Sequence, residues 1–404
     1  MTSYSLDGET QLIKGIFEEM VNRMESLGGA EHPRNFPAGS PEAGFISYGH
    51  ARVTPFDPET AKFVALDMVR EAGVQLRLHT FVADAIVEDG AVTGVVAASK
   101  SGLEALKAQI TVDCSADADV AARAGAAFEK GRDEDGLLQP MTLFFRVKNV
   151  NNAVVEEYVH SHTDDFRPFE SLVMQAREAG EFPIPRKGIG MYRTGEDGVW
   201  RINTTRLHRL DGTSVEDLTQ GEIDGREQVK ALLTFFRKRL PGFENVELLD
   251  TASMVGVRET RRIVGEYQLK LDDLATAREF DDVIALCGYP VDIHSPTDDS
   301  GGTDGKLATA NIYQIPYRSL VPRDLNGILV AGRSLSATHE AQAAVRVMPP
   351  VFAMGQAAGT AAALAIEYGS EPRAVPVKQL QEMMVRQGVY LGDKYEKTPA
   401  GSHR

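Results

Sequence analysis

Only two of the 404 residues are cysteines, and this scarcity excludes several kinds of site. Cys114 and Cys287 are far apart and match no CxxC or zinc-binding pattern. A disulfide framework and an iron–sulfur cluster held by four thiolates are therefore not expected. The sequence also lacks GxSxG, HExxH and P-loop motifs, which disfavours the hydrolases and nucleotide kinases built on those motifs.

Metal-ligand patterns are also sparse. Asp113, Asp117 and Asp119 lack the regular ligand spacing of an EF-hand, so a turn capped by acids is the better interpretation. His160 and His162 stand without a third ligand in view, which favours a solvated helix face. No metal site is expected.

Basic charge is in deficit, and export signals are missing. The formal net charge is −15, and no block rich in Lys or Arg offsets it, which disfavours nucleic acid and anionic membrane surfaces as partners. The first twenty residues lack the basic start and apolar core of a secretory signal. A cytoplasmic protein acting on a small molecule is expected.

One apolar run, residues 347–366, raises the question of a membrane span. Its Gly, Ala and Pro residues make it weakly hydrophobic, and no basic cluster flanks it. We therefore expect a buried helix rather than a span.

What is present indicates a soluble α/β protein of two or three domains, since 43% of the residues are hydrophobic and 25% are charged. Helical spacing predicts a helix over 8–27, and Asp57 with Pro58 predicts the start of another that stops at Gly73. Alternation over 74–79 predicts a half-buried strand. Turn signals at Asp89-Gly90 and Ser101-Gly102 predict a meander of three short strands.

Composition changes near residue 141, where aromatic residues, arginines and long polar loops begin. We predict that residues 1–140 and 318–372 form one split domain around an inserted α+β domain, 141–317. A C-terminal helix and tail, 373–404, follow.

The stretch AGRSLSATHEAQAAVRVMPP, 331–350, is the most informative. Residues 328–330 predict a strand buried on both faces, and Gly332 allows a sharp turn at its end. Pro349 or Pro350 suits the first turn of a helix whose interior holds Gly355 and Gly359. Two interior glycines suggest that a backbone or a ligand passes close; a tightly packed helix is the alternative.

Several segments together resemble a known family. LVAGRSLSATHEAQAAVRVMPPVFAMGQAAGTAAALA is similar to the C-terminal flavin-binding segment of FAD-dependent oxidoreductases with the glutathione-reductase-like FAD/NAD(P)-binding superfold. VTPFDPETAKFVALDMVREAGVQLRLHTFV, ITVDCSADADVAARAGAAFE, GVRETRRIVGEY and IPYRSLVP match in order, so the resemblance covers nearly the whole chain. It implies a Rossmann-like FAD-binding domain with a β-meander.

The resemblance also implies which residues hold FAD. Gly332 and Arg333 would lie beside the pyrophosphate and ribityl chain, Pro350 and Gly355 would face the isoalloxazine, and Val82 would meet the adenine through its backbone. The remaining cofactor-binding candidates are Asp117 and Met348.

Two departures from the family stand out. The strand–GxGxxG–helix unit that opens these proteins is not found, and Gly188-Ile189-Gly190 has the wrong spacing. The chain is therefore expected to lack its N-terminal βαβ unit. Where the family usually reads ATGD, this chain reads CSAD, and Ala116 tolerates a positive φ badly.

The implied reaction is hydride transfer between a substrate C–H and flavin N5, with a protein group managing the proton. His339 and His294 are the candidates, and each has the alternative of a hydrogen-bonded loop histidine.

Arginines supply candidates for substrate binding. At helical spacing, Arg258 and Arg262 share a face that could bind a carboxylate or phosphate, and a salt-bridged face is the alternative. Arg346 precedes the helix start, where it would hold a substrate anion or the flavin O2, or would pair with Glu340.

These features predict an FAD-dependent oxidoreductase, or an N-terminally truncated fragment of one, acting on a small organic molecule. The alternative is a cofactor-free flavoprotein-like binding module, or a subunit that another chain completes.

Overall fold

The structure, a computed structural model, describes residues 1–35, 52–165, 168–186, 188–297 and 307–396. The helices are α1 (Ile16–Ser26), α2 (Pro58–Glu71), α3 (Asp119–Arg123), α4 (Asn152–Ser161), α5 (Glu170–Glu178), α6 (Val215–Arg239), α7 (Leu271–Ala275), α8 (His339–Val345), α9 (Met348–Tyr368), α10 (Val377–Arg386) and α11 (Asp393–Glu396), with 3-10 turns η1 (Pro33–Asn35), η3 (Tyr317–Leu320) and η4 (Pro372–Ala374). The strands are β1 (Phe81–Glu88), β2 (Ala91–Ser99), β3 (Gly102–Lys107), β4 (Thr111–Asp113), β5 (Phe128–Lys130), β6 (Phe145–Lys148), β7 (Met191–Arg193), β8 (Trp200–Ile202), β9 (Glu247–Thr251), β10 (Arg261–Ile263), β11 (Val283–Cys287), β12 (Tyr313–Pro316) and β13 (Ile328–Val330).

The predicted meander is confirmed. β1, β2 and β3 form an antiparallel sheet in sequence order, and their turns lie at Asp89-Gly90 and near Gly102. Asp89 and Gly90 both have positive φ (50° and 77°), as a two-residue hairpin turn requires. The residues of the turns therefore favour the antiparallel pairing of these strands.

β4 and β13 form a parallel pair, although more than 200 residues separate them in sequence. Ile328 pairs with Thr111, and Val330 pairs with Asp113. The three residues of β13 are fully buried, as predicted for 328–330. Because the strands are parallel, their carboxyl ends meet at one edge, where ligands bind in α/β sheets.

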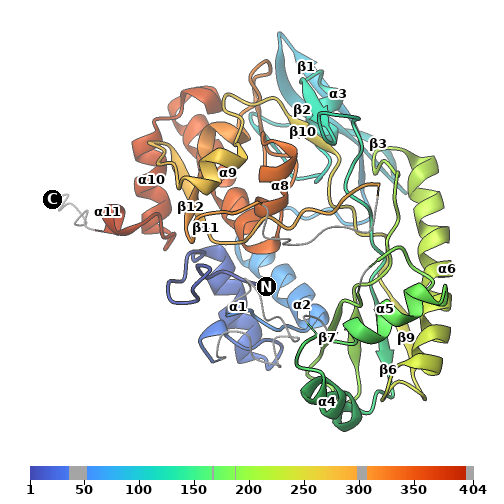
Figure 1. Cartoon of the computed structure of the whole chain (residues 1–404). Coiled ribbons are helices and arrows are strands. Elements are labelled where there is room, and N and C mark those ends of the chain that lie inside the picture. The colour runs from blue at the N-terminus through green and yellow to red at the C-terminus, as the bar shows by residue number, and fades with distance from the viewer. Residues whose placement is uncertain (36–51, 166–167, 187, 298–306, 397–404) are drawn as a thin grey trace.

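Two large hydrophobic cores occupy different parts of the molecule (Figure 1). One combines the N-terminal segment with α8, α9 and α10. The other lies within 141–255, where the sheet β7-β8-β6-β9 packs beside α4, α5 and α6 around Trp200. The described residues of 269–293 and 307–317, predicted to belong to the inserted domain, pack in the first core instead. Their strands β11 and β12 contact each other, and β11 contacts α9, so apolar packing returns them to that core.

Helix α9 begins with Pro349 and Pro350 in its first turn and is mostly buried, as predicted. By length and composition alone, α9 could cross a membrane, and among the described residues it is the one helix that passes this test. It contacts α1, α10 and β11. Its apolar surface is thus covered by the protein itself.

Two predicted elements differ from the structure. The predicted helix 8–27 begins only at Ile16, because Gly8 and Gly15 adopt positive φ (74° and 64°). The predicted strand 74–79 is wrong: its backbone joins no ladder, and Leu78 is 65% exposed. Alternation gives a strand only where another strand lies alongside, and the described residues supply none there.

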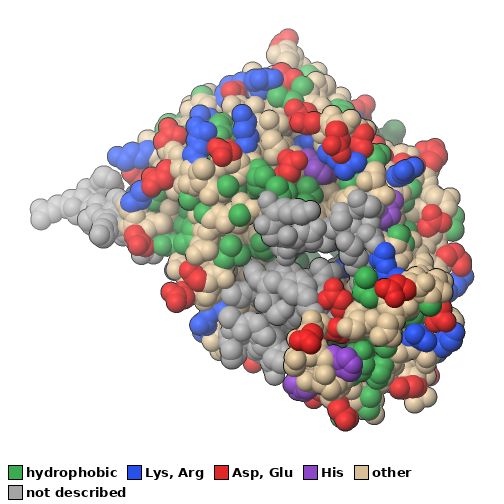
Figure 2. Space-filling view, in the orientation of Figure 1, with side chains coloured by type: hydrophobic (Ala, Val, Ile, Leu, Met, Phe, Trp, Pro, Cys, Tyr) green, Lys and Arg blue, Asp and Glu red, His purple; other side chains and the backbone are tan. Residues whose placement is uncertain are grey.

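Charge is distributed evenly on the face in Figure 2, where acidic and basic side chains are interspersed. The net charge of −15 is therefore not gathered into one patch on that face.

Candidate functional site

A hollow of about 160 Å³ lies beyond the carboxyl ends of β4 and β13. It is lined by Cys114 and Ala116 after β4, by Ala331, Gly332 and Arg333 after β13, and by Arg346, Val351 and Gly355 at the start of α9. Small-molecule pockets usually start at roughly 300 Å³. The hollow is thus smaller than a typical small-molecule pocket, and we call the residues that line it the wall.

On the β13 side of the hollow, the chain turns at Gly332, whose φ is 108°. Only glycine adopts this conformation readily. The turn directs Arg333 toward Asp117, and Arg333 Nη2 lies 2.6 Å from Asp117 Oδ1. The structure thus brings together three residues that the resemblance assigns to FAD.

The β4 side is strained where the CSAD sequence departs from the family pattern. Ala116 and Ala118 both have positive φ (71° and 51°), which costs roughly 1–2 kcal/mol for a residue with a side chain. Buried Asp113 holds this turn, because its carboxylate accepts the backbone N–H groups of Ser115 (2.9 Å) and Ala121 (3.0 Å). The expected conflict at Ala116 therefore exists and is absorbed by local hydrogen bonds.

Gly355 and Gly359 both lie in α9, and no other atom lies within 4 Å of a Cβ built on either. Close approach of a backbone therefore does not explain them. Gly355 lines the hollow, whereas Gly359 is exposed one turn later. For Gly355, the close approach of a ligand therefore stays a prediction.

Other predicted cofactor residues lie outside the hollow. Val82 lies in β1, where it pairs with Ala97 of β2, and it packs on the small core around α3. Met348, at the first position of α9, is 42% exposed. Pro350 is buried in the first turn of α9.

His339 is the first residue of α8 and is only 5% exposed. Its Nδ1 lies 2.9 Å from the Glu259 carboxylate. Thr338 caps α8 by accepting the N–H of Ala341. His339 was predicted in a loop beside the flavin segment; it lies instead in a buried helix turn and does not line the hollow.

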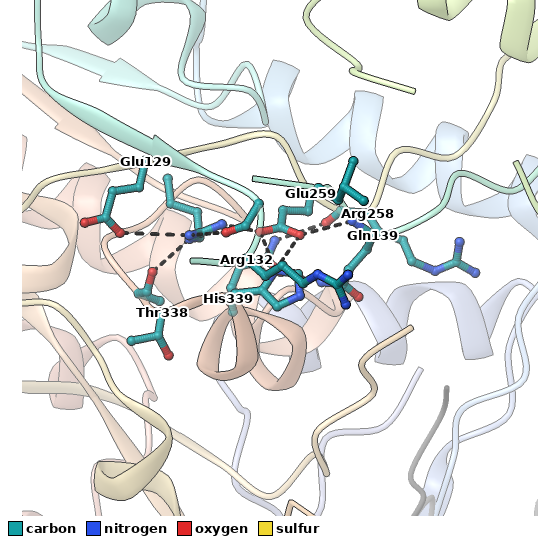
Figure 3. A network of polar contacts seen from close by, with 12 residues as sticks. Glu129, Arg132, Gln139, Arg258, Glu259, Thr338 and His339 are labelled. Atoms are coloured by element: carbon teal, nitrogen blue, oxygen red, sulfur yellow. Dashed lines mark hydrogen bonds and ion pairs between the residues drawn. The ribbon is translucent and has the colours of Figure 1, made fainter. Parts of the chain in front are cut away.

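Glu259 is the centre of a buried polar network (Figure 3). Besides His339, it pairs with Arg262, and it accepts the backbone N–H of Gln139 at 3.2 Å. The side chain of Gln139 donates to Gln342 (3.2 Å). Gln342 in turn donates to the carbonyls of Arg258 (3.0 Å) and Arg333 (3.2 Å). The network links Glu259 to the hollow.

The substrate-binding role predicted for Arg262 is not supported. Its side chain is 1% exposed and donates to Glu259, Gly131 and Ala337. The prediction assumed a helix, but Arg262 lies in strand β10 and Arg258 precedes it. The two arginines therefore do not share a helix face.

Arg258 and Arg346 lie in a second group, together with Asp292 and His294. Arg346 Nη2 donates to the Asp292 carbonyl (2.8 Å) and lies 3.6 Å from its carboxylate. Arg346 thus pairs with Asp292 and not with Glu340. Burial, with Arg346 nearby, lowers the pKa of Arg258 to about 9, so it stays charged at neutral pH.

His294 is buried between Asp292 and Arg206. Its Nε2 lies 3.4 Å from Asp292 Oδ1, and its Nδ1 lies 3.0 Å from Arg206 Nη2. Arginine can only donate, so Nδ1 is an acceptor and Nε2 carries the proton. Burial lowers the pKa of His294 to about 3, against the opposing effect of Asp292. His294 is therefore neutral at neutral pH.

Several members of these groups could not be predicted from the sequence. Gln139, Arg206, Asp292 and Gln342 carry no motif of their own. The spacing of Asp292 and His294, two residues apart, was the one available signal.

Cys114 offers a direct probe of the hollow. It is exposed, and packing around its sulfur, followed by the Asp113 charge, raises its thiol pKa. Alkylation of Cys114 by iodoacetamide should therefore be slow at neutral pH and accelerate only above pH 9, the ordinary thiol pKa, because the thiolate is the reactive form. Saturating FAD should protect Cys114, whereas buried Cys287 stays unlabelled throughout. Equal labelling rates with and without FAD, read by mass spectrometry, would contradict a cofactor at this wall.

The wall suits part of an FAD molecule. Within the described part of the chain, the buried Nε atoms of Arg333 and Arg346 have no hydrogen-bond partner, and such groups call for one. Phosphate oxygens or a flavin carbonyl would supply it. Gly332, Arg333, Arg346 and Gly355 are the residues that would hold the cofactor.

A search of solved structures finds matches at low identity and with TM-scores below 0.5. They include a geranylgeranyl bacteriochlorophyll reductase-like protein of Thermoplasma acidophilum (13% identity, 81% of this chain and 59% of that chain, TM-score 0.39). L-proline dehydrogenase of P. horikoshii (13%, 89% and 69%, TM-score 0.34) and the myxobacterial FAD-dependent halogenase CndH (14%, 98% and 74%, TM-score 0.42) also match.

The chain spans between 47% and 59% of the length of the first four solved structures that it matches. A search of curated proteins finds no match. The sequence pattern of the family described as FAD dependent oxidoreductase matches residues 1–384, nearly the whole chain. The strand–turn–helix wall and this match agree, and the chain belongs to the FAD-dependent oxidoreductase family.

Proposed function

We propose that this protein transfers a hydride between a small organic substrate and FAD, with the substrate lying between the hollow and the group around His294. The observation that carries the proposal is the wall at the carboxyl ends of β4 and β13, which Gly332, Arg333, Arg346 and Gly355 line and where Gly332 turns the chain. The Nε atoms of Arg333 and Arg346 are buried and have no partner among the described residues. FAD, when bound, supplies the hydride-accepting or hydride-donating centre.

The proton that accompanies the hydride is assigned to His294. It is neutral, its Nδ1 is the acceptor nitrogen, and Asp292 holds the proton of Nε2. Arg206 currently donates to Nδ1, so a substrate that draws Arg206 away frees this nitrogen to take a proton. His339 acts through Glu259 as a positioning residue, because its Nδ1 is engaged inside the buried network.

The first experiment is the visible absorption spectrum of the purified chain before and after FAD is added. A bound flavin with a perturbed band is expected, and it would show that the wall present is sufficient for binding. No perturbed band at saturating FAD would contradict the proposed function of this chain as it stands.

Stopped-flow reduction of the bound flavin then separates the two histidines. His294→Asn should keep FAD bound and slow the reduction by about 10²–10⁴-fold, the usual effect of losing a general base. The matched variant His339→Asn should leave the reduction within about tenfold of wild type while lowering stability. The reverse pattern would move the proton role to His339.

The pH profile gives an independent check. Protonation of His294 should abolish its role as acceptor, and its pKa is lowered by burial to about 3. The kcat/KM of flavin reduction should therefore stay flat as the pH falls from 8 to about 5. An acid limb near 6.5, the ordinary histidine value, would contradict the assignment.

A further inference from the structure

Two arginines beside the hollow have hydrogen-bond donors without a partner among the described residues. Within the described residues, Arg258 donates only through Nη1, to the Pro140 carbonyl and to Thr142 Oγ1 (2.6 Å). Its Nε and Nη2 have no partner there, and the residue is half-buried. An arginine fork with two adjacent open donors matches the two oxygens of a carboxylate or phosphate.

Arg346 lines the hollow, and its Nη2 donates to the carbonyls of Asp292 (2.8 Å) and the Gln139 side chain (3.4 Å). Gln139 precedes Pro140, whose carbonyl accepts from Arg258, so the two arginines bind neighbouring residues. The charges of Arg258 and Arg346 act on each other. Like charges brought together at a partly buried place cost free energy unless an anion lies between them.

Further arginines lie near Arg258. Arg186 and Arg206, only 6% and 4% exposed, also act on Arg258. The Asp292 carboxylate opposes their effect, and His294 is neutral. The Asp292 side chain is 27% exposed, so solvent reaches this group.

We infer that Arg258 and Arg346 form an anion subsite that binds an oxyanion group, carboxylate or phosphate, of the substrate. The inference rests on the proposed function, since it places the substrate beside the FAD wall. Arg346 joins the subsite to the hollow, and Arg258 is held in place by Thr142 and Pro140. The substrate class is therefore a small organic anion.

Isothermal titration of the full chain with succinate, inorganic phosphate and neutral succinamide, each with and without saturating FAD, tests the subsite. We expect succinate or phosphate to bind in both states and succinamide not to bind. The tighter of the two anions with FAD present identifies the oxyanion. If FAD abolishes anion binding, the arginines belong to the cofactor site, and the inference is overturned.

Variants expected to weaken anion binding and a variant expected to tighten it extend the test. Arg258→Gln should weaken anion binding by about 10- to 100-fold, as expected for a hydrogen bond to a charged group, and Arg258→Lys should restore part of it. Asp292→Asn should tighten it, because a competing carboxylate is removed. Arg193→Gln is the matched control, since Arg193 pairs with Glu156 at 2.6 Å in the same part of the chain and is not placed in the subsite.

Each outcome decides between the two proposals. Equal affinities in Arg258→Gln and Arg193→Gln would overturn the subsite, even if FAD binds and is reduced. Anion binding that depends on Arg258 in a chain that binds no FAD would support the subsite and reject the proposed function. Thermal melting in the presence of phosphate confirms that each variant is folded before its affinity is compared.

Discussion

Glu259→Gln is expected to lower the free energy of unfolding by about 3–5 kcal/mol, the usual effect of breaking a buried ion pair from one side. Glu259 and Arg262 are both essentially inaccessible, with 0% and 1% of their side chains exposed. Glutamine has nearly the same shape but no charge. It would leave the buried Arg262 guanidinium with only the half-exposed Glu129 carboxylate, 3.9 Å away, as counter-charge. It would also weaken the contact with His339 Nδ1.

The control for Glu259→Gln is Glu227→Gln in helix α6. Glu227 and Lys230 have the same three-residue spacing, but their side chains are 64% and 71% exposed. Exposed pairs contribute about 0–1 kcal/mol, so this variant should unfold almost as wild type does.

Urea unfolding followed by far-UV circular dichroism reports the whole chain. The fluorescence of Trp200, the only tryptophan, reports the core within 141–255. A loss below about 1 kcal/mol in Glu259→Gln would show that the network does not hold the fold. Adding Arg262→Met to Glu259→Gln should recover part of the loss, because the unpaired charge is then removed.

Gly355→Leu is expected to raise the Kd for FAD by at least about 100-fold, equivalent to about 2.7 kcal/mol. The backbone of α9 accepts a side chain there, since nothing lies within 4 Å of the Cβ position. The leucine side chain would then fill the hollow that Gly355 lines. Helix propensity favours leucine over glycine by up to about 1 kcal/mol, so the fold should not suffer.

Gly359→Leu separates blocking from a general effect on the helix. Gly359 lies one turn further along α9, its Cβ position is equally open, and it is exposed outside the hollow. Flavin fluorescence titrations should give wild-type affinity for Gly359→Leu. Equal FAD binding by both variants would remove the hollow from the cofactor site.

Local patterns in the sequence predicted the elements that form the wall. The apolar run of β13, the glycine turn at Gly332 and the two prolines that start α9 each depend on a few neighbouring residues. Backbone sterics and capping act over the same short distances. The family resemblance added FAD, which the match over residues 1–384 supports.

The partners of the polar side chains were decided by tertiary structure alone. His339 and Glu259 are 80 positions apart, and His294 and Arg206 are 88 positions apart. Residues 269–293 and 307–317 joined the first core, and 74–79 formed no strand because no partner strand lies alongside in the described residues. Local spacing predicted that Arg258 and Arg262 share a face. In the structure, packing buries Arg262, whereas Nε and Nη2 of Arg258 have no partner among the described residues. Long-range packing, which no local pattern encodes, thus determines which charges meet at the site.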